Sequence, residues 1–167
     1  MTDTLVQGLA SLLGGKVSGE VIIFIISMIP VIELRGAIPI GVGLGLSHVE
    51  AMGVSIAGNM MPVPFIILFI RPIFKWMTKH SPRLGRLAEK LEAKAEGKWD
   101  RIHRFQFFAL TLFVAIPLPG TGAWSGALIA AVMNMRLRNA LPSILLGVII
   151  AGILVTGLTY GFTSVFV

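Results

Sequence analysis

The sequence predicts an all-α integral membrane protein built as an inverted repeat, in which each half is a re-entrant helical hairpin followed by a transmembrane helix. Three observations lead to this expectation. Of the 167 residues, 55% are hydrophobic and only 13% are charged, whereas soluble domains carry roughly 25% charged residues. Prolines and glycines interrupt two of the apolar segments near their centres. The excess positive charge is confined to one segment between two apolar halves.

That basic segment predicts the orientation of the chain. Residues 71–104 contain ten Lys and Arg residues and four acids, and the difference equals the net charge of the whole chain, +6. The positive-inside rule places such a segment on the cytoplasmic side of a membrane. No aromatic-and-basic motif accompanies it, so we expect a membrane surface and no nucleic acid as its partner. The expected location is the inner (cytoplasmic) membrane, with several passes.

The chain is expected to form a single membrane domain with six parts. Leu5, Leu9 and Leu12 share one helical face near the N-terminus, which favours a helix lying in the membrane interface. Ser81-Pro82 is typical of a helix start and Gly97 of a helix end, which predicts an amphipathic linker helix. In order, the parts are an interfacial helix (1–17), a first re-entrant hairpin (18–47), a transmembrane helix (48–77), a basic cytoplasmic linker (78–104), a second re-entrant hairpin (105–135) and a second transmembrane helix (136–167).

Each broken segment could either cross the membrane as one kinked span or turn back as a hairpin. A spanning helix needs about 20 residues, and residues 20–30 and 36–46 are each about half that long. The second segment is followed by Arg136 and Arg138, which kinked spans would place outside and hairpins would place in the cytoplasm. The hairpin alternative therefore agrees better with the positive-inside rule.

The two halves can be overlaid at a shift of 86 to 89 residues. Pro30 then falls on Pro117, Gly36 on Gly122, and the pair Ala51-Met52 on Ala140-Leu141. Residue identity is low, but the elements follow in the same order in both halves. Because the hairpins would enter from opposite sides, the sequence predicts an inverted repeat.

Glu33 and Arg35 at the first break are the strongest functional candidates. They are the charged residues within the apolar segments, and a charge at that depth costs about 3 kcal/mol on insertion scales. In an extended hairpin tip both side chains could face one cavity, whereas on a helix residues two apart diverge. The alternatives are a site that handles a substrate or proton, and an ion pair that only holds the tip together.

The second break, residues 115–126, carries no charge. It offers backbone amides at the start of a half-helix, where an anion could bind with Arg35 on its other side. The alternative is that its glycines only allow close packing of the hairpins. With Gly36, Pro39 and Asn59 from the first half, the candidate substrate and proton-coupling residues are Glu33, Arg35, Gly36, Pro39, Asn59, Pro117, Gly120, Thr121, Gly122, Trp124 and Ser125.

An enzyme is not expected. The sequence contains no cysteine, no Ser-His-Asp pattern and no nucleotide-binding loop, and its three histidines lack metal-ligand spacing, so no cofactor or metal is predicted. Asn59 precedes Pro62 and Pro64 in the first full span, where the prolines should bend the helix.

The motifs Ile32-Glu33-Leu34-Arg35-Gly36-Ala37-Ile38-Pro39 and Pro117-Leu118-Pro119-Gly120-Thr121-Gly122-Ala123-Trp124-Ser125-Gly126 resemble those of the bacterial and archaeal small multidrug export family, over residues 18 to 165. That family is similar to the larger DedA/VTT superfamily of membrane transporters, whose implied architecture is a repeat of re-entrant hairpin plus spanning helix. The resemblance implies lipid transport, including undecaprenyl phosphate, and proton-dependent drug tolerance. It identifies Glu33 with the membrane acid of the family.

We therefore expect a small secondary transporter, coupled to protons and acting on a membrane lipid of the lipid-phosphate type. In this hypothesis Glu33 binds a proton, while Arg35 and the backbone at Gly120 and Gly122 hold the anionic headgroup. The alternative is a proton-coupled exporter of lipophilic organic cations, with Glu33 as the partner of the cation. Four short membrane elements can barely enclose a path, so a non-transporting scaffold is a second alternative. Small transporters avoid this limit by pairing, so a homodimer is expected.

Overall fold

The computed structural model of the chain describes residues 18–80, 86, 99–118 and 120–166. The regular secondary structure of these residues is all α-helical, which confirms the expected class. The predicted interfacial helix (1–17) and most of the predicted linker lie outside them. The helices are α2 (Gly19–Ser27), α3 (Glu33–Gly43), α4 (His48–Met60), α5 (Val63–His80), α7 (Trp99–Ala115), α8 (Ala123–Val132) and α9 (Leu137–Phe166).

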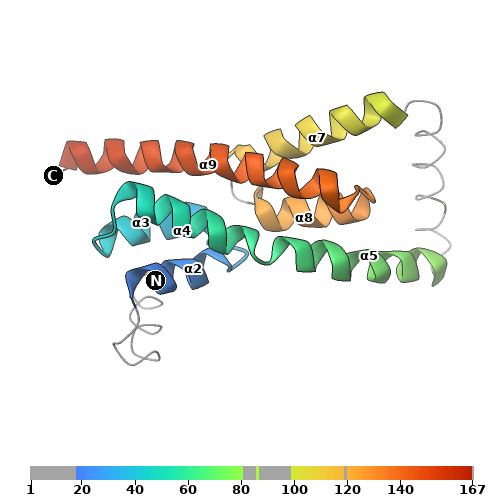
Figure 1. Ribbon diagram of the computed structural model, residues 1–167, viewed down its shortest axis with the longest axis horizontal. Helices are drawn as coiled ribbons and strands as arrows, with labels where there is room; N and C mark the ends of the chain where they lie inside the picture. The colour runs from blue at the N-terminus through green and yellow to red at the C-terminus, as the bar shows by residue number, and fades with distance from the viewer. Residues whose placement is uncertain (1–17, 81–85, 87–98, 119, 167) are drawn as a thin grey trace.

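The helices lie along the long axis of the molecule (Figure 1). α4 and α5 follow one another from end to end, and α9 runs back along most of the length. α2 and α3 form an antiparallel pair against α4 and the C-terminal half of α9, and we call this pair the first hairpin. α7 and α8 form the second hairpin, against α5 and the N-terminal half of α9.

The two hairpins point toward each other, and their turns meet near the middle of the molecule (Figure 1). We call residues 28–35 the first tip and residues 116–124 the second tip. The main apolar core runs through this junction. It joins Leu34 and Ile38 of the first hairpin to Val63 and Ile67 of α5 and to Val148 of α9, all buried.

Two helical stretches, His48–Ile73 and Leu137–Gly161, are long and apolar enough to cross a membrane. The first is interrupted where α4 gives way to α5 at Met61 and Pro62. A proline lacks the backbone N–H that would continue the ladder of helical hydrogen bonds. The bend expected from the prolines is therefore present, and it lies at the level of the two tips (Figure 1).

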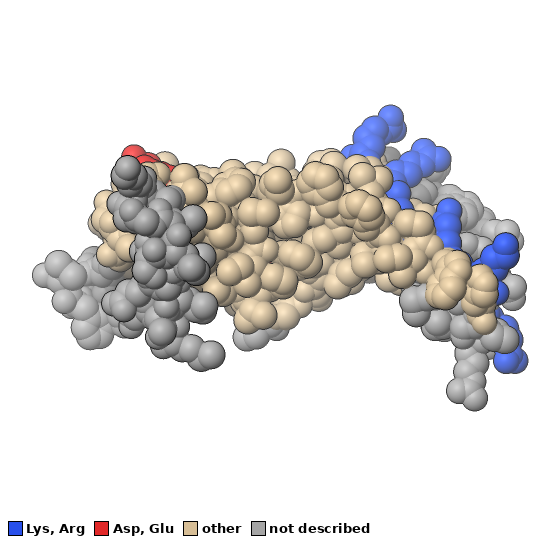
Figure 2. Space-filling view, turned by 90° about the horizontal axis from the view of Figure 1, so that it is seen from below, with Lys and Arg blue, Asp and Glu red and all other residues tan. Residues whose placement is uncertain are grey.

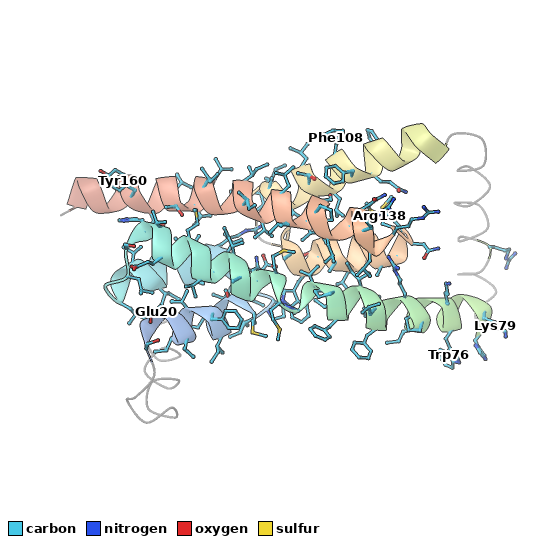
Figure 3. All side chains as sticks on the ribbon, in the orientation of Figure 1. Glu20, Trp76, Lys79, Phe108, Arg138 and Tyr160 are labelled. Carbon is cyan, nitrogen blue, oxygen red and sulfur yellow. The ribbon has the colours of Figure 1, made fainter. Side chains whose placement is uncertain are left out.

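Charged side chains gather at opposite ends of the molecule, and the surface between them is mostly free of charge (Figure 2). One end, which we call the acidic end, carries the exposed Glu20 and Glu50. The other, the basic end, lies where α5 ends and α9 begins (Figure 3). Its exposed cations in the described chain are Lys75, Lys79, Arg86, Arg136 and Arg138.

The turns after α3 and α8 have the same construction. Gly45 follows α3 with φ +90°, and Asn134 follows α8 with φ +52°. Both are left-handed residues of the kind that ends a helix in a Schellman motif. The paired hydrogen bonds of that motif are Leu46 N to Gly41 O (3.0 Å) and Gly45 N to Val42 O (3.0 Å) in the first case, and Met135 N to Ala130 O (2.9 Å) and Asn134 N to Ala131 O (3.1 Å) in the second.

The helix after each turn crosses its own hairpin at a glycine. On α4, a Cβ added to Gly58 would overlap the carbonyl oxygen of Phe24 on α2. On α9, a Cβ added to Gly147 would lie 2.8 Å from the carbonyl oxygen of Thr111 on α7. In both halves only glycine permits the backbones to approach this closely. The two turns and the two glycines are each 89 residues apart in the sequence.

Two helix ends lie inside the segment 78–104, which was expected to be a cytoplasmic linker. α5 continues to His80, and α7 begins at Trp99. The expected end of the linker was placed at its last basic residue, Arg104. A helix continues past its apolar part, because each added residue gains a backbone hydrogen bond. Glu33 and Arg35 were expected in an extended tip, and both lie in the first turns of α3.

Candidate functional site

The first and second tips are joined by hydrogen bonds from Trp124. Its indole nitrogen Nε1 donates to the carbonyl oxygen of Met28 at 3.0 Å. Met28 directly follows α2, and the last carbonyls of a helix have no partner within the helix. Trp124 is itself in the first turn of α8. One side chain therefore connects the end of α2 to the start of α8.

Arg35 extends from α3 to the second tip. Its guanidinium donates to the carbonyl oxygen of Ile116 at 3.2 Å, to the hydroxyl of Thr121 at 2.8 Å and to the carbonyl oxygen of Leu118. Ile116 follows the last residue of α7, so this cation lies at the negative end of the dipole of α7. Arginine is suited to this position because it presents several donors in a rigid plane.

Glu33 lies at the positive end of the dipole of α8, the other helix of the same hairpin. Its carboxylate oxygen Oε1 is 3.4 Å from the backbone nitrogen of Trp124, at the start of α8. The side chain is 4% exposed. A Cβ on Gly122, the residue that caps α8, would overlap the Glu33 carboxylate. Glu33 therefore occupies the position at a helix N-terminus where an anion is favoured.

The backbone of Glu33 is strained. Its φ is +48°, in the left-handed region, which costs a residue with a Cβ roughly 1–2 kcal/mol. Such strain persists only where surrounding contacts determine it, and it is concentrated at functional sites. Here the contacts are those of the carboxylate with Gly122 and Trp124.

Glu33 and Arg35 form no ion pair within 4.0 Å in the described structure; each is bound to the second tip instead. Because they lie two residues apart on a helix, their side chains diverge. The alternative suggested by the sequence, an ion pair that holds the tip together, is therefore not seen in this part of the chain. Arg35 is held by two carbonyls and a hydroxyl of the second tip.

The hydroxyl groups of Thr121 and Ser125, two of the candidate substrate residues, are engaged in hydrogen bonds within residues 116–125. Thr121 Oγ1 lies 2.6 Å from the carbonyl oxygen of Ile116 and accepts the hydrogen bond from Arg35. Ser125 Oγ donates to the carbonyl oxygen of Gly120 at 2.6 Å. These bonds give the tip a defined shape and leave little capacity for another anion.

The remaining candidate residues are Gly36, Pro39, Asn59 and Pro117. Pro39 is exposed and lies inside α3, where its missing N–H leaves the carbonyl of Arg35 without its usual helical donor. Gly36, directly after the first tip, and Pro117, in the second tip, are half-buried. Asn59, at the end of α4, is fully buried, and neither its amide oxygen nor its amide nitrogen has a partner in the described structure.

Sequence reasoning missed the role of Arg71. It was counted with the basic segment, but it is half-buried on α5 and donates to the carbonyl oxygen of Met135, just after α8. A cation is favoured near the C-terminus of a helix. α8 thus has Glu33 at its first turn and Arg71 beyond its last. The sequence contains no signal for such pairings, because each joins residues more than sixty positions apart.

Nothing in the described part of the chain resembles a metal centre, since no three His, Asp or Glu side chains there are grouped closely enough to hold an ion. The chemistry available at the junction is therefore that of one buried carboxyl group, one arginine and the backbone dipoles of α7 and α8.

Comparison with known families gives a match to the model of the small multi-drug export proteins over residues 33–154. The matched segment starts at Glu33 and includes both Arg35 and the whole second tip. The comparisons with curated proteins and with solved structures gave no match.

Proposed function

We propose that this chain, a membrane protein that belongs to the family of small multi-drug export proteins, is a proton-coupled exporter whose proton-binding group is Glu33. One observation carries the proposal. Glu33 is a buried carboxyl group where the two tips meet, whereas Glu20 and Glu50 are exposed at the acidic end. Intramembrane acids of this kind mark proton and substrate pathways in transporters.

The proposal includes an arrangement in the membrane. α4–α5 and α9 span it, the first hairpin enters from the acidic end, and the second enters from the basic end. The matched turns at Gly45 and Asn134 and the matched glycines 58 and 147 support an inverted repeat. The cations at the basic end favour a cytoplasmic position for that end and for residues 78–104, in an inner membrane. A homodimer belongs to the same proposal, because two copies could enclose a path that one cannot.

A proton on Glu33 would act on the contact between the hairpins. The ionised carboxylate is favoured at the start of α8 by about 0.3–1 kcal/mol, and by up to about 2 kcal/mol when partly buried. Protonation removes that attraction, while Arg35 keeps its bonds to the second tip. The tips could then separate on the α8 side and pivot about Arg35, which would shift the population toward a second conformation.

The chemistry of the junction favours a cationic substrate over an anionic one. The groups that could hold a lipid phosphate, Arg35 and the start of α8, are already bound to protein acceptors and to Glu33. A carboxylate released from α8 could bind either a proton or an amphipathic organic cation, and competition between the two would couple their movements. This order of preference agrees with the family description. The lipid phosphate favoured by the sequence becomes the second candidate.

Transport by the purified protein in liposomes tests the proposal. With a proton gradient imposed, we expect uptake of a fluorescent organic cation such as ethidium. The variant Glu33→Gln should lose proton-driven uptake by about tenfold or more, equivalent to about 1.4 kcal/mol of lost coupling. Arg138→Gln, which removes an exposed charge at the basic end, is the control and should transport as the wild type does.

Two results would contradict this assignment. Proton-driven uptake by Glu33→Gln at the wild-type rate would exclude Glu33 as the coupling group. Movement of a lipid phosphate between leaflets, lost in Arg35→Ala and accompanied by no cation uptake, would identify the lipid as the substrate.

A further inference from the structure

Two buried polar side chains on α4 have no hydrogen-bond partner in the part of the chain that the structure describes. Ser55 and Asn59 are both 0% exposed, and among the described residues nothing bonds Ser55 Oγ, Asn59 Oδ1 or Asn59 Nδ2. The two residues are four apart, so they project from the same face of the helix. Buried polar groups in native proteins are nearly always satisfied, and ordered water is the usual partner when the protein supplies none.

The packing of α4 on α3 places this pair beside Glu33. The two helices are antiparallel and are joined by a short turn, and a Cβ on Gly41 would lie 2.9 Å from the Cβ of Ala51. From that contact, one turn along both helices brings Ala37 opposite Ser55. A second turn brings the N-terminal end of α3, where Glu33 is the first residue, opposite Asn59. Ala37 and Glu33 are both buried.

The other half of the molecule shows that packing does not require polar residues here. The shift of 89 residues that relates the turns and the crossing glycines places Ser55 on Ile144 and Asn59 on Val148. Both equivalents on α9 are apolar and fully buried in the main core. Elsewhere in that half, Ser143 Oγ donates to the carbonyl oxygen of Phe107 at 2.7 Å, and Thr156 Oγ1 is the buried polar atom without a partner among the described residues. At the positions that correspond to Ser55 and Asn59, unpaired polarity is therefore particular to the half that contains Glu33.

The same face of α4 continues toward the acidic end. His48 lies seven residues before Ser55, two helical turns away, and its Nε2 is buried without a partner among the described residues. Across from α4, the buried Thr156 Oγ1 of α9 likewise has no partner in that part of the chain. Gly152, one turn from Thr156, packs on Met52 and Ile56 of α4. Polar atoms without a partner among the described residues are thus spread along α4 and the facing part of α9, from the acidic end toward the middle of the molecule.

We propose that Ser55 and Asn59 hold water against Glu33 and that protons reach Glu33 along this face of α4 from the acidic end, an inference that rests on the proposed function. Arg35 is the other charged group at this depth in the described chain, and it faces the second tip. The titratable groups at the entrance are Glu20, His48, Glu50 and Tyr160, and His48 packs edge-on against Tyr160. Glu33 would therefore exchange protons on one side while the second hairpin closes the other.

Reactivity of single cysteines with silver ions tests for the water directly, without any transport. The wild-type chain has no cysteine, so Ser55→Cys carries one thiol, and Ile144→Cys is its counterpart in the other half. We expect Ag⁺ to modify Ser55→Cys at least about tenfold faster than Ile144→Cys, whose thiol reacts only on local opening. Reaction should occur when Ag⁺ is added on the side of the acidic end. Equal rates, or reaction from the basic side only, would overturn the inference.

A transport measurement separates this inference from the proposed function. The double variant Ser55→Ala/Asn59→Val copies the apolar character of the other half, and we expect it to bind ethidium normally but to lose proton-driven uptake. Ser143→Ala is the control and should retain coupling. If Glu33→Gln lacks coupling while the double variant keeps it, the proton path is wrong and the proposed function stands. If Glu33→Gln keeps coupling, the proposed function fails, and the silver reaction still decides whether water is present.

Discussion

At the scale of single residues, the junction matches each charge to a backbone dipole. Glu33 lies at the start of α8, where N–H groups point outward, and Arg35 lies at the end of α7, where carbonyls do. Each charge is thereby compensated without an ion pair between them. A direct ion pair would leave both helix ends unsatisfied in an apolar surrounding. In the observed arrangement, the side chains of Glu33 and Arg35 are each compensated by a helix end, and each helix end gains a charged partner.

Gly122 controls how closely Glu33 approaches α8. Its φ of +152° and ψ of −166° belong to a region that is essentially restricted to glycine, and a Cβ would overlap the Glu33 carboxylate. We expect Gly122→Ala to lower the free energy of unfolding by about 2–3 kcal/mol, from strain and from displacement of the carboxylate. The measurement is thermal or denaturant unfolding in detergent.

Gly120→Ala is the matched control for that substitution. Gly120 also has a positive φ, +85°, but apart from its neighbours in the chain no heavy atom of the described residues lies within 4 Å of an added Cβ. It should therefore show only the conformational cost of about 1 kcal/mol. If both variants lose the same stability, the contact between Gly122 and Glu33 is not what determines the effect.

At the scale of elements, the position of each hairpin depends on a glycine in the helix that follows it. Gly58 on α4 and Gly147 on α9 sit against the backbone carbonyls of Phe24 and Thr111. Membrane helices associate through close contacts of this kind, because in lipid no hydrophobic driving force brings them together. We expect Gly58→Ala and Gly147→Ala each to lower the unfolding free energy by about 1–3 kcal/mol, the usual cost of overpacking.

Gly53→Ala and Gly157→Ala provide controls on the same two helices. Neither position has a heavy atom within 4 Å of an added Cβ. Alanine there should be neutral or stabilising by up to about 1 kcal/mol, because it lowers the entropy of the unfolded chain. Unfolding curves for all four variants make the comparison. A loss at Gly53 as large as that at Gly58 would show that the close crossing is not what matters.

The ends of these elements could be predicted from sequence better than their contacts. The prolines and glycines near Pro30 and Pro117 correctly indicated two breaks, and Pro62 indicated the bend between α4 and α5. The left-handed backbone of Glu33 could not be predicted, because local preferences oppose it and distant contacts impose it. The partners of Arg35 are likewise backbone carbonyls more than eighty residues away. Every residue has a backbone carbonyl group, so the sequence does not indicate which of these groups accepts a hydrogen bond from Arg35.

At the scale of the whole molecule, the charges at the two ends and the opposed hairpins suggest one orientation in a membrane. The acidic end contains the start of α2 and the turn between α3 and α4, and the basic end contains the end of α5 and the turn between α8 and α9 (Figures 1 and 3). If the hairpins are re-entrant, both ends of each hairpin lie on one side of the membrane. If they cross, the two ends of each lie on opposite sides.

Cysteine labelling in cells distinguishes these arrangements, because the chain has no cysteine of its own. Lys79→Cys and Arg136→Cys are exposed positions on either side of the second hairpin, and Glu20→Cys and Val49→Cys flank the first. With a membrane-impermeant maleimide, we expect the first pair to react only from the cytoplasm and the second pair only from outside, because cations are retained on the cytoplasmic side. Cysteines at residues 79 and 136 that react from opposite sides would mean that residues 99–132 cross the membrane. The two tips would then no longer be turns at its centre, and Glu33 would lose the two-sided access that alternating transport requires.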